Sequence, residues 1–317
     1  PVPSLPEEEL VREAEEAGLE KGILLAVDVD PSRLRSWRIR RRLWKRIRNS
    51  QTLHSPHAAH LLGRWASLTT SFKAVEDLAQ EVMPRVKTEN AAVARLVEKY
   101  PNLFVGFGSV DPTRGSRYVK QKLKEIASLR LRGIKLLPTA QFFNPSRERG
   151  VELIAEFCEK NRMAILFHTG CDPGPFEIPE VAEDANPKYL IPLLERYSPQ
   201  VILAHMGYYS ALKPGIWVDE ALRVAKRFDN VWLDTAAIAP QLFRDDRQLT
   251  WSREKTCEKI RRETGFDKVL FGSDYPLVPS SSIKSMARSV MDSPLLTQSE
   301  KEMVLYQNAK EFLRLIC

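Results

Sequence analysis

Polar side chains in this 317-residue sequence stand at the ends of short apolar runs in its second half. His168 lies at the end of one such run and His205 ends the next. Lys135 lies within an earlier run, and Asp274 directly follows the last. Imidazole nitrogen and carboxylate oxygen are the ligands that Zn²⁺ prefers in catalytic sites. A metal held by His168, His205 and Asp274 would lower the pKa of a bound water from about 16 to about 7 and polarise a carbonyl group.

Each of these residues also has a purely structural interpretation. A single histidine at a strand end is more often a hydrogen-bonding group than a metal ligand, whereas two on consecutive strands, together with an aspartate, favour a site. Lys135 is equally open to a structural role, because a strand lysine can extend its amino group to water or pair with a carboxylate. For Asp234, at the end of another run, we favour helix capping or a backbone contact.

The apolar runs recur along the chain, and amphipathic segments separate them. The runs cover residues 23–29, 103–109, 133–137, 164–169, 201–205, 230–235 and 268–273. The helical patterns include residues 118–131, 150–160, 187–197, 217–227, 251–264 and 299–315. Apolar runs without polar alternation are typical of parallel strands buried on both faces. Strands and helices that alternate in steps of about 30–40 residues predict βαβ units and a parallel sheet.

We therefore predict one α/β domain over residues 1–317, a (β/α)8 TIM barrel. In this fold the carboxyl ends of the strands meet at one mouth, where the four polar side chains would converge. A closed barrel has eight strands, and seven are visible in the sequence. A helix-like segment, residues 5–17, precedes the first visible strand, so the pattern predicts another strand just before Pro1. We expect the first barrel strand to be missing from the sequence.

Residues 31–89 interrupt the pattern after the second barrel strand, and we expect a basic helical insertion that forms a lid. Its stretch from Arg33 to Arg48 holds nine cations and no acid, interleaved with Trp37 and Trp44. The first interpretation is a solvated helix face, and the second is neutralisation of an acidic substrate or of a partner subunit. The third is binding of nucleic acid or an anionic membrane, with the tryptophans as anchors.

The same insertion contains a second cluster of candidate ligands. His54, His57 and His60 are spaced three residues apart, so neighbours share one face of a helix. Ser55 and Pro56 read as a helix start, which favours a solvated first turn over metal binding.

Composition limits the classes of protein to which the chain can belong. No run reaches the roughly 18–20 apolar residues of a membrane span, and no signal peptide is visible at the start. The four cysteines are far apart without a C-x-x-C pair, which is typical of reduced thiols in a cytoplasm. The formal net charge of +7 favours anions as ligands.

Several strings of the sequence resemble the amidohydrolase superfamily, in particular its amidohydrolase-related branch. That branch includes the relatives of aminocarboxymuconate-semialdehyde decarboxylase and many uncharacterised hydrolases. The resemblance covers roughly Phe104 to the C-terminus. It rests on GIKLLP (133–138), ILFHTG (165–170), VILAHMG (201–207), NVWLDT (230–235), VLFGSDYP (269–276) and LTQSEKEMVLYQNAKEFL (296–313).

The resemblance implies a role for each polar side chain. His168 corresponds to the metal ligand on the fifth barrel strand, and His205 to the sixth-strand histidine that contacts the metal or the substrate. Asp274 corresponds to the eighth-strand aspartate, which touches the metal and moves the proton of its water. Lys135 matches a lysine that is carbamylated in binuclear relatives. A single metal is more usual in this branch, so Lys135 is expected to act on the substrate or through its charge.

One feature departs from the family. The family carries an H-x-H pair on its first strand, and this sequence has none. The missing pair and the missing strand point to the same place, immediately before Pro1. Without that pair, a chain with two ligands and open positions would bind zinc poorly, and the family's activity would not be expected of it.

The expected function is hydrolysis of an amide, lactone or ester by metal-activated water, with Zn²⁺ as the first choice of metal and Mn²⁺ as the second. The alternative is metal-dependent, non-oxidative decarboxylation of an aromatic or unsaturated carboxylic acid, in which Asp274 protonates carbon. A second alternative is an inactive barrel whose basic insertion binds nucleic acid. We expect a small anionic substrate and a homodimer, and we do not expect a nucleic acid or a membrane as partner.

Overall fold

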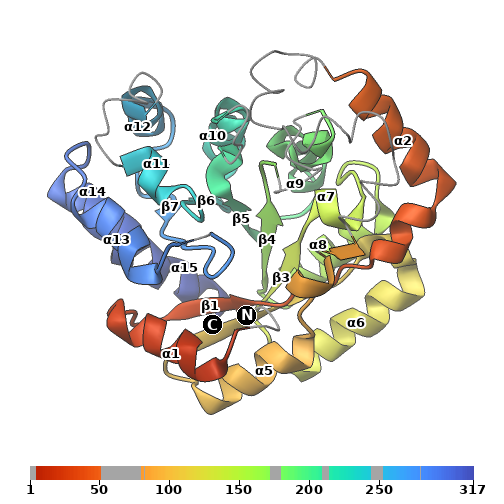
Figure 1. Ribbon diagram of the computed structural model, residues 1–317, viewed down its shortest axis with the longest axis horizontal. Coiled ribbons are helices and arrows are strands. Elements are labelled where there is room, and N and C mark those ends of the chain that lie inside the picture. The colour runs from red at the N-terminus through yellow and green to blue at the C-terminus, as the bar shows by residue number, and fades with distance from the viewer. Residues whose placement is uncertain are drawn as a thin grey trace.

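Seven parallel strands in one curled sheet form the centre of the molecule (Figure 1). The computed structural model describes residues 5–50, 80–81, 83–171, 180–208, 214–243, 253–278 and 280–317. Each strand pairs in parallel with the next one along the chain. The strands are β1 (Gly22–Leu25), β2 (Phe104–Ser109), β3 (Gly133–Leu136), β4 (Ala164–His168), β5 (Gln200–Ala204), β6 (Val231–Asp234) and β7 (Val269–Leu270).

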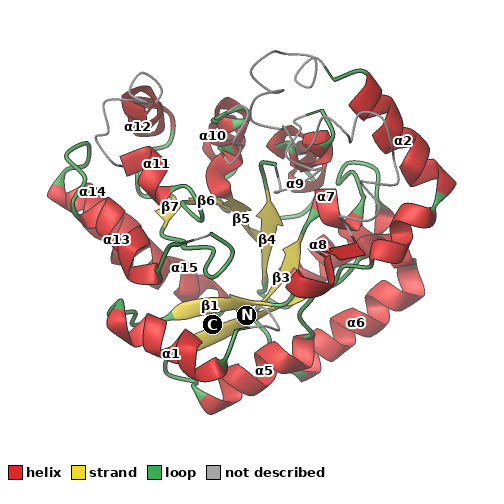
Figure 2. Ribbon diagram, viewed as in Figure 1, coloured by secondary structure: helices red, strands yellow, loops and turns green. Residues whose placement is uncertain are grey.

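Helices surround the curled sheet (Figure 2). The longer ones are α1 (Glu7–Glu16), α2 (Trp37–Arg48), α5 (Asn90–Lys99), α6 (Ser116–Ser128), α8 (Arg149–Lys160), α10 (Val218–Arg227), α12 (Arg253–Glu263), α13 (Ile283–Met291) and α15 (Asn308–Ile316). Short ones are α7 (Pro138–Gln141), α9 (Ile191–Leu194), α11 (Ala239–Phe243) and α14 (Gln298–Glu302). Tight 3₁₀ turns and one π-helical turn, η9 (Met303–Gln307), join or extend them. Among the residues described, no helix is long and apolar enough to cross a membrane.

Burial on both faces explains why these runs form strands. All residues of β2, β3 and β4 are buried. One set of their side chains packs against the outer helices, as Ile134 and Ile165 do in the main core. The opposite set, which includes Phe107 and Leu166, meets inside the curl. Full burial of a side chain of this size contributes about 1.5–3 kcal/mol, so both faces stabilise the sheet.

The predicted fold class is confirmed, and so is the predicted count of strands. Among the described residues, β1 and β7 are the two ends of the sheet and no strand joins them, which matches a (β/α)8 barrel that lacks one strand. Two predicted helices are less regular than expected. The segment 187–197 divides into a 3₁₀ turn and the short α9, which has Pro192 in its first turn. The C-terminal helix is interrupted by the π-helical turn η9.

The arginine-rich stretch folds into η1 (Pro31–Arg35) and the helix α2. Its apolar side chains Ile39, Leu43 and Ile47 recur every four residues and are buried. They join a hydrophobic cluster separate from the main core, which we call the α2 cluster. It consists of Val29, Leu34, Ile39, Leu43, Ile47, Met83, Phe142 and Val181. His54, His57 and His60 lie outside the described residues.

Candidate active site

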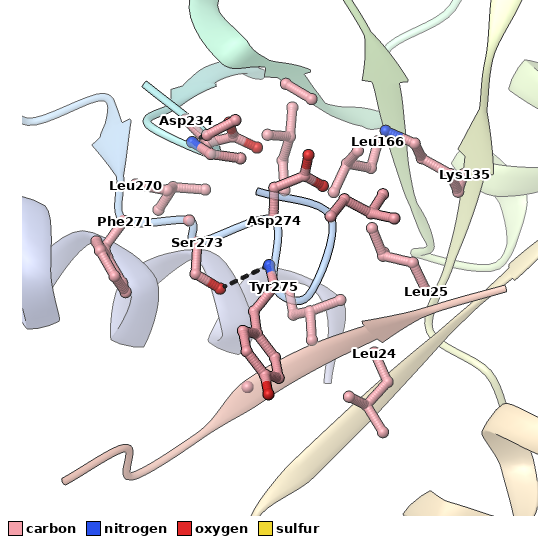
Figure 3. A pocket seen from close by; sticks show the side chains of 18 of the residues that line it. Leu24, Leu25, Lys135, Leu166, Asp234, Leu270, Phe271, Ser273, Asp274 and Tyr275 are labelled. Carbon is pink, nitrogen blue, oxygen red and sulfur yellow. Dashed lines mark hydrogen bonds between the residues drawn. The ribbon is translucent and has the colours of Figure 1, made fainter. Parts of the chain in front are cut away.

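A cavity of about 540 Å³ opens inside the curled sheet. Its apolar walls come from several strands and include Leu24, Leu25, Leu166, Ile202 and Leu270. Its lining also contains the polar side chains of Lys135, His168, His205, Asp234, Ser273 and Asp274. The structure therefore brings all four side chains singled out in the sequence to one cavity. In the view of Figure 3, the Asp274 carboxylate lies between Asp234 and Lys135.

Lys135 supplies a positive charge to this cavity from the middle of the sheet. It lies in β3, and its side chain is buried. Its charge lowers the pKa of both histidines and of Asp274. Such a charge inside an apolar cavity favours a negatively charged group beside it, because little water is present to screen the attraction.

His168 and His205 form a hydrogen-bonded pair whose tautomers follow from their partners. The Nδ1 atom of His205 lies 2.8 Å from the backbone carbonyl of Ala236, and its Nε2 lies 3.2 Å from Nδ1 of His168. Because a carbonyl oxygen only accepts, Nδ1 of His205 must donate. In the neutral ring Nε2 is then an acceptor, so Nδ1 of His168 donates to it. This assignment leaves Nε2 of His168 without a proton.

Burial keeps both rings neutral. Desolvation lowers the pKa of His168 well below its usual value, and the nearby His205 and Lys135 lower it further. Desolvation also lowers the pKa of His205 to about 4, although Asp234 acts in the opposite direction. Near pH 7 the pair therefore carries lone pairs and no positive charge, which is the state that a metal ligand or a proton acceptor needs.

A strained turn places His205. His205, Met206 and Gly207 have φ angles of 62°, 52° and 64°, so three successive residues are left-handed. A side chain in this conformation costs roughly 1–2 kcal/mol. The turn is held at both ends, because Thr169 Oγ1 accepts from the backbone N–H of Gly207 at 2.8 Å and Asp234 accepts from that of His205.

Asp234 makes the backbone contacts that the sequence suggested. Its Oδ1 accepts from the N–H of His205 at 2.7 Å and from the N–H of Ala236 at 3.0 Å. It also lines the cavity. Burial raises its pKa, while His205 and the two backbone hydrogen bonds oppose the rise. Asp234 thus fixes the His205 turn and the loop that carries the Ala236 carbonyl.

Asp274 contributes a carboxyl group with a raised pKa to the cavity. It follows β7 with a φ of 57°, and the turn beside it is held by a hydrogen bond from Tyr275 N to Ser273 Oγ at 3.2 Å. Burial raises the pKa of Asp274 to about 6, and the positive charge of Lys135 limits the rise. A carboxyl group whose pKa lies close to the working pH can both accept and donate a proton.

The fit of these residues to a metal ion is partial. The 3.2 Å between Nδ1 of His168 and Nε2 of His205 is close to the ~3.3 Å that separates two ligands of a tetrahedral zinc ion with bonds of about 2.0–2.1 Å. Within the part of the chain that the structure describes, however, no three His, Cys, Asp or Glu side chains group together as a metal site. Asp274 lines the same cavity without completing such a group. The described residues therefore do not form a whole metal site.

Other residues of the site carried no recognisable signal in the sequence. Ala236 acts through its backbone carbonyl, which every residue type possesses. Thr169 is one of many threonines, and its role depends on the turn that it supports. Met83 and Val86 of the insertion line the cavity together with Ala140. That contact brings the end of the insertion to the wall of the site.

Comparison with known proteins decides the family. A family model described as amidohydrolase matches residues 66–315 of the 317. The chain belongs to the amidohydrolase family. Its candidate site therefore lies in an enzyme family, in agreement with the resemblance seen in the sequence. A search of curated proteins found no match to this amidohydrolase.

Solved structures share the fold at low sequence identity. An uncharacterized TIM-barrel protein from Bordetella bronchiseptica superposes with a TM-score of 0.63 and 18% identity, over 98% of this chain and 83% of that one. A probable 2-pyrone-4,6-dicarboxylic acid hydrolase from Acinetobacter baumannii has a TM-score of 0.59 and 14% identity, over 97% and 88%. A 5-carboxyvanillate decarboxylase from Sphingomonas paucimobilis has a TM-score of 0.56 and 16% identity, over 96% and 82%. These likenesses establish the TIM-barrel fold.

Proposed function

We propose that this amidohydrolase hydrolyses a carbonyl substrate, an amide, lactone or ester, that carries a carboxylate. The observation that supports this most is the combination of Asp274 and Lys135 in one largely apolar cavity. A proton-transferring acid with a pKa of about 6 thus shares the cavity with a buried positive charge. A small number of polar groups among apolar walls is the usual make-up of a small-molecule site.

The substrate class follows from the lining. Lys135 would neutralise a carboxylate, while Leu25, Leu166 and Ile202 would contact an apolar ring or short chain. Two of the similar structures bear names of enzymes for carboxylated compounds, a pyrone dicarboxylate and a carboxyvanillate. We therefore propose a carboxylated cyclic lactone as the first substrate to test.

The residues of this chain would act on water and on the leaving group. Ionised Asp274 takes a proton from the water whose oxygen attacks the carbonyl carbon. The bond from that carbon to the ring oxygen then breaks, and Asp274 returns the proton to the departing oxygen. Lys135 holds the substrate carboxylate during both steps. Proximity of these groups alone lowers the barrier, because no separate encounter is required.

We further propose His168 and His205 as ligands of a divalent metal, with zinc as first choice and manganese as second. When bound, such an ion supplies an acidified water and polarises the carbonyl group. The neutral rings support this role. The spacing of the facing nitrogens also supports it, once the proton on Nδ1 of His168 has moved to its Nε2.

The test is a substrate panel with matched charge. Carboxylated lactones and esters and their uncharged methyl esters would be incubated with the protein, with zinc and manganese supplied in turn. We expect hydrolysis of the carboxylated lactones, loss of activity in Asp274→Asn, and a KM at least about tenfold higher in Lys135→Met for carboxylated substrates only. Absence of hydrolysis across the panel with both metals would refute the proposal.

Decarboxylation is the second candidate, and the raised pKa of Asp274 favours it specifically. With a pKa of about 6, part of the Asp274 population is protonated near neutral pH. A protonated carboxyl group can deliver its proton to the ring carbon that loses CO₂. Release of CO₂ from a panel of carboxylated phenols, without hydrolysis of lactones, would select this reaction over the first.

A further inference from the structure

Asp184 joins three segments that surround the candidate site. Arg46 on α2 donates to both of its carboxylate oxygens, at 2.9 and 3.1 Å. Asn144 donates to the same carboxylate at 2.9 Å, and a nitrogen of Arg42 lies 3.7 Å from it. Asp184 itself is only 4% exposed. A two-pronged contact between arginine and carboxylate in a buried place is among the stronger polar interactions in proteins.

The joined segments belong to three different strand-to-helix connections. α2 lies in the connection after β1, Asn144 in the one after β3, and Asp184 in the one after β4. Backbone contacts add to the junction, because Arg42 donates to the carbonyl of Phe142 at 2.8 Å and Arg46 to that of Val181 at 3.1 Å. Connections at the carboxyl ends of barrel strands build the active-site mouth of such folds.

The α2 cluster shares Phe142 and Val181 with this junction and reaches the cavity through Met83. Met83, Phe142 and Val181 meet the apolar face of α2 in that cluster. Met83 also lines the cavity, as does Ala140, which packs against the same cluster. Through this cluster α2 supports a wall of the cavity, although no described residue of α2 lines the cavity itself.

We propose that Asp184 is the latch that holds α2 against the wall of the candidate active site. Asp184 is a positioning residue in this proposal, and it acts through Arg46 and Arg42. If its charge is lost, two arginines are left partly buried without their carboxylate, which is more costly than the absence of the whole ion pair. α2 and the Asp184 segment then separate more often, and the cavity wall opens.

A native thiol can report this separation. Cys171 is buried against Ala182 and Ala185, which flank Asp184 in the 3₁₀ turn η5 (Ala182–Ala185). Cys158 and Cys257 are buried elsewhere, in the main core. None of the four cysteines is in a disulfide, and Cys317 is exposed. Opening of the latch would therefore expose Cys171 and leave Cys158 and Cys257 covered.

The experiment measures the rate at which each cysteine reacts with 5,5′-dithiobis(2-nitrobenzoate), with the site identified by peptide mass spectrometry. The full chain with Cys317→Ser serves as the parent, which removes the exposed thiol. Asp184→Asn keeps the shape of the side chain and removes its charge, and Arg46→Gln removes the opposite charge. Arg38→Gln is the matched control, because Arg38 is an exposed cation of the same helix.

We expect Cys171 to react about tenfold faster or more in Asp184→Asn and in Arg46→Gln, because loss of one partner of a buried ion pair strongly favours opening. The double variant should react within about twofold of the faster single one, since both changes break the same contact. Arg38→Gln should react like the parent. Unchanged labelling of Cys171 in Asp184→Asn, or equal acceleration at Cys158 and Cys257, would overturn the latch.

A second readout concerns the site itself and rests on the proposed function. With a hydrolysed lactone as substrate, Asp184→Asn should raise KM and leave kcat within about twofold, because the chemical groups stay in place. The labelling experiment stands by itself if no lactone is hydrolysed. Failure of the latch and failure of the proposed reaction are therefore distinguishable.

Discussion

Burial of the Asp274 carboxyl group makes the folded state less stable at neutral pH. Burial holds its pKa at about 6, above the ordinary 3.8. The folded state therefore binds the proton more tightly than the unfolded chain does. The stability that this proton contributes is fully present below pH 3.8 and is lost as the pH rises through 6. At neutral pH the ionised Asp274 carboxylate therefore lowers the stability of the fold. Such a cost is common for functional residues.

The first prediction follows from the direction of this pKa shift. Asp274→Asn should raise the free energy of unfolding by about 1 kcal/mol more at pH 8 than at pH 4.5. This difference in unfolding free energy is smaller than the full pKa difference would give, because Asp274 is partly open to solvent in the cavity. Urea unfolding at the two pH values measures it. Equal effects at both would show that the carboxyl group is not desolvated.

The second prediction concerns the pH profile of catalysis. If Asp274 is the base, kcat/KM rises with pH through about 6. Lys135 lowers the pKa of Asp274, so Lys135→Met should move this acid limb to higher pH. Lys135→Arg keeps the charge and should leave the limb near its original position. A limb that does not move in Lys135→Met would remove Lys135 from the electrostatics of the site.

The positions of His168, His205, Lys135 and Asp274 could be predicted from the sequence because each depends on its distance from a strand end. Their protonation could not, because it depends on which atoms face the rings after folding. Asp184 illustrates the same limit. In the sequence it is one aspartate in a loop, and only the docking of α2 identifies its partners.

At the scale of elements, the His205 turn is the most constrained part of the site. Gly207 has a φ of 64°, and a Cβ there would lie 2.5 Å from the backbone oxygen of Trp217. Gly215 has a φ of 80°, but its Cβ would meet nothing closer than 3.6 Å. A comparison of the two positions therefore separates the cost of a left-handed backbone from the cost of a steric collision.

The third prediction uses this pair. Gly215→Ala should cost about 1 kcal/mol, the ordinary cost of a left-handed side chain. Gly207→Ala should cost at least about 2 kcal/mol, because Trp217 or the turn must also shift. Denaturant unfolding gives both values. Similar losses in the two variants would mean that the His205 turn adapts without strain.

The cations of helix α2 fall into two groups, one that contacts neighbouring loops and one that faces solvent. Arg42 and Arg46 hold α2 to its neighbours. The outer cations Arg38, Arg41, Lys45 and Arg48 are exposed and recur at helical spacing on one face. The sequence predicted a basic helical insertion, but this division of the cations depends on the loops against which α2 packs. The side chains of Ile39, Leu43 and Ile47 are buried in the α2 cluster and do not face solvent.

The fourth prediction tests the hypothesis of an inactive barrel that binds nucleic acid. The triple variant Arg38→Gln, Lys45→Gln and Arg48→Gln should keep its stability within about 0.5 kcal/mol, since like charges at this spacing repel. A deletion of residues 33–48 would also remove the latch, so the triple variant is the sharper tool. We expect no retention of RNA by the parent at 150 mM salt. Retention that is lost in the triple variant would instead support nucleic-acid binding.

At the scale of the whole molecule, the curled sheet brings residues from distant parts of the chain to one cavity. The class of fold and the number of strands followed from the sequence because buried parallel strands leave continuous apolar runs. The break in the final helix at η9 did not follow. Its buried side chains Val304, Phe312 and Ile316 are spaced by multiples of four residues, which a regular helix would also give.

The fifth prediction concerns metal. The described donors do not complete a metal site, so we expect cobalt(II) to bind weakly and to be removed by dialysis against a chelator. Visible absorption of bound cobalt should disappear in His168→Ala and in His205→Ala. It should persist in His57→Ala if the histidines of the insertion are not ligands. Absorption that survives both of the first two changes would place the metal elsewhere.

The hydrogen bond from His205 to the backbone carbonyl of Ala236 has a consequence for mutagenesis. A main-chain oxygen decides where the protons of two imidazoles reside, and every amino acid brings that same oxygen. A mutational scan at position 236 would thus test only the packing of a buried side chain and leave the carbonyl oxygen in place. Semisynthesis can replace this one amide by an ester or thioamide and so weaken the carbonyl acceptor. Nitrogen-15 spectroscopy of the two imidazole rings would then show whether their tautomers change.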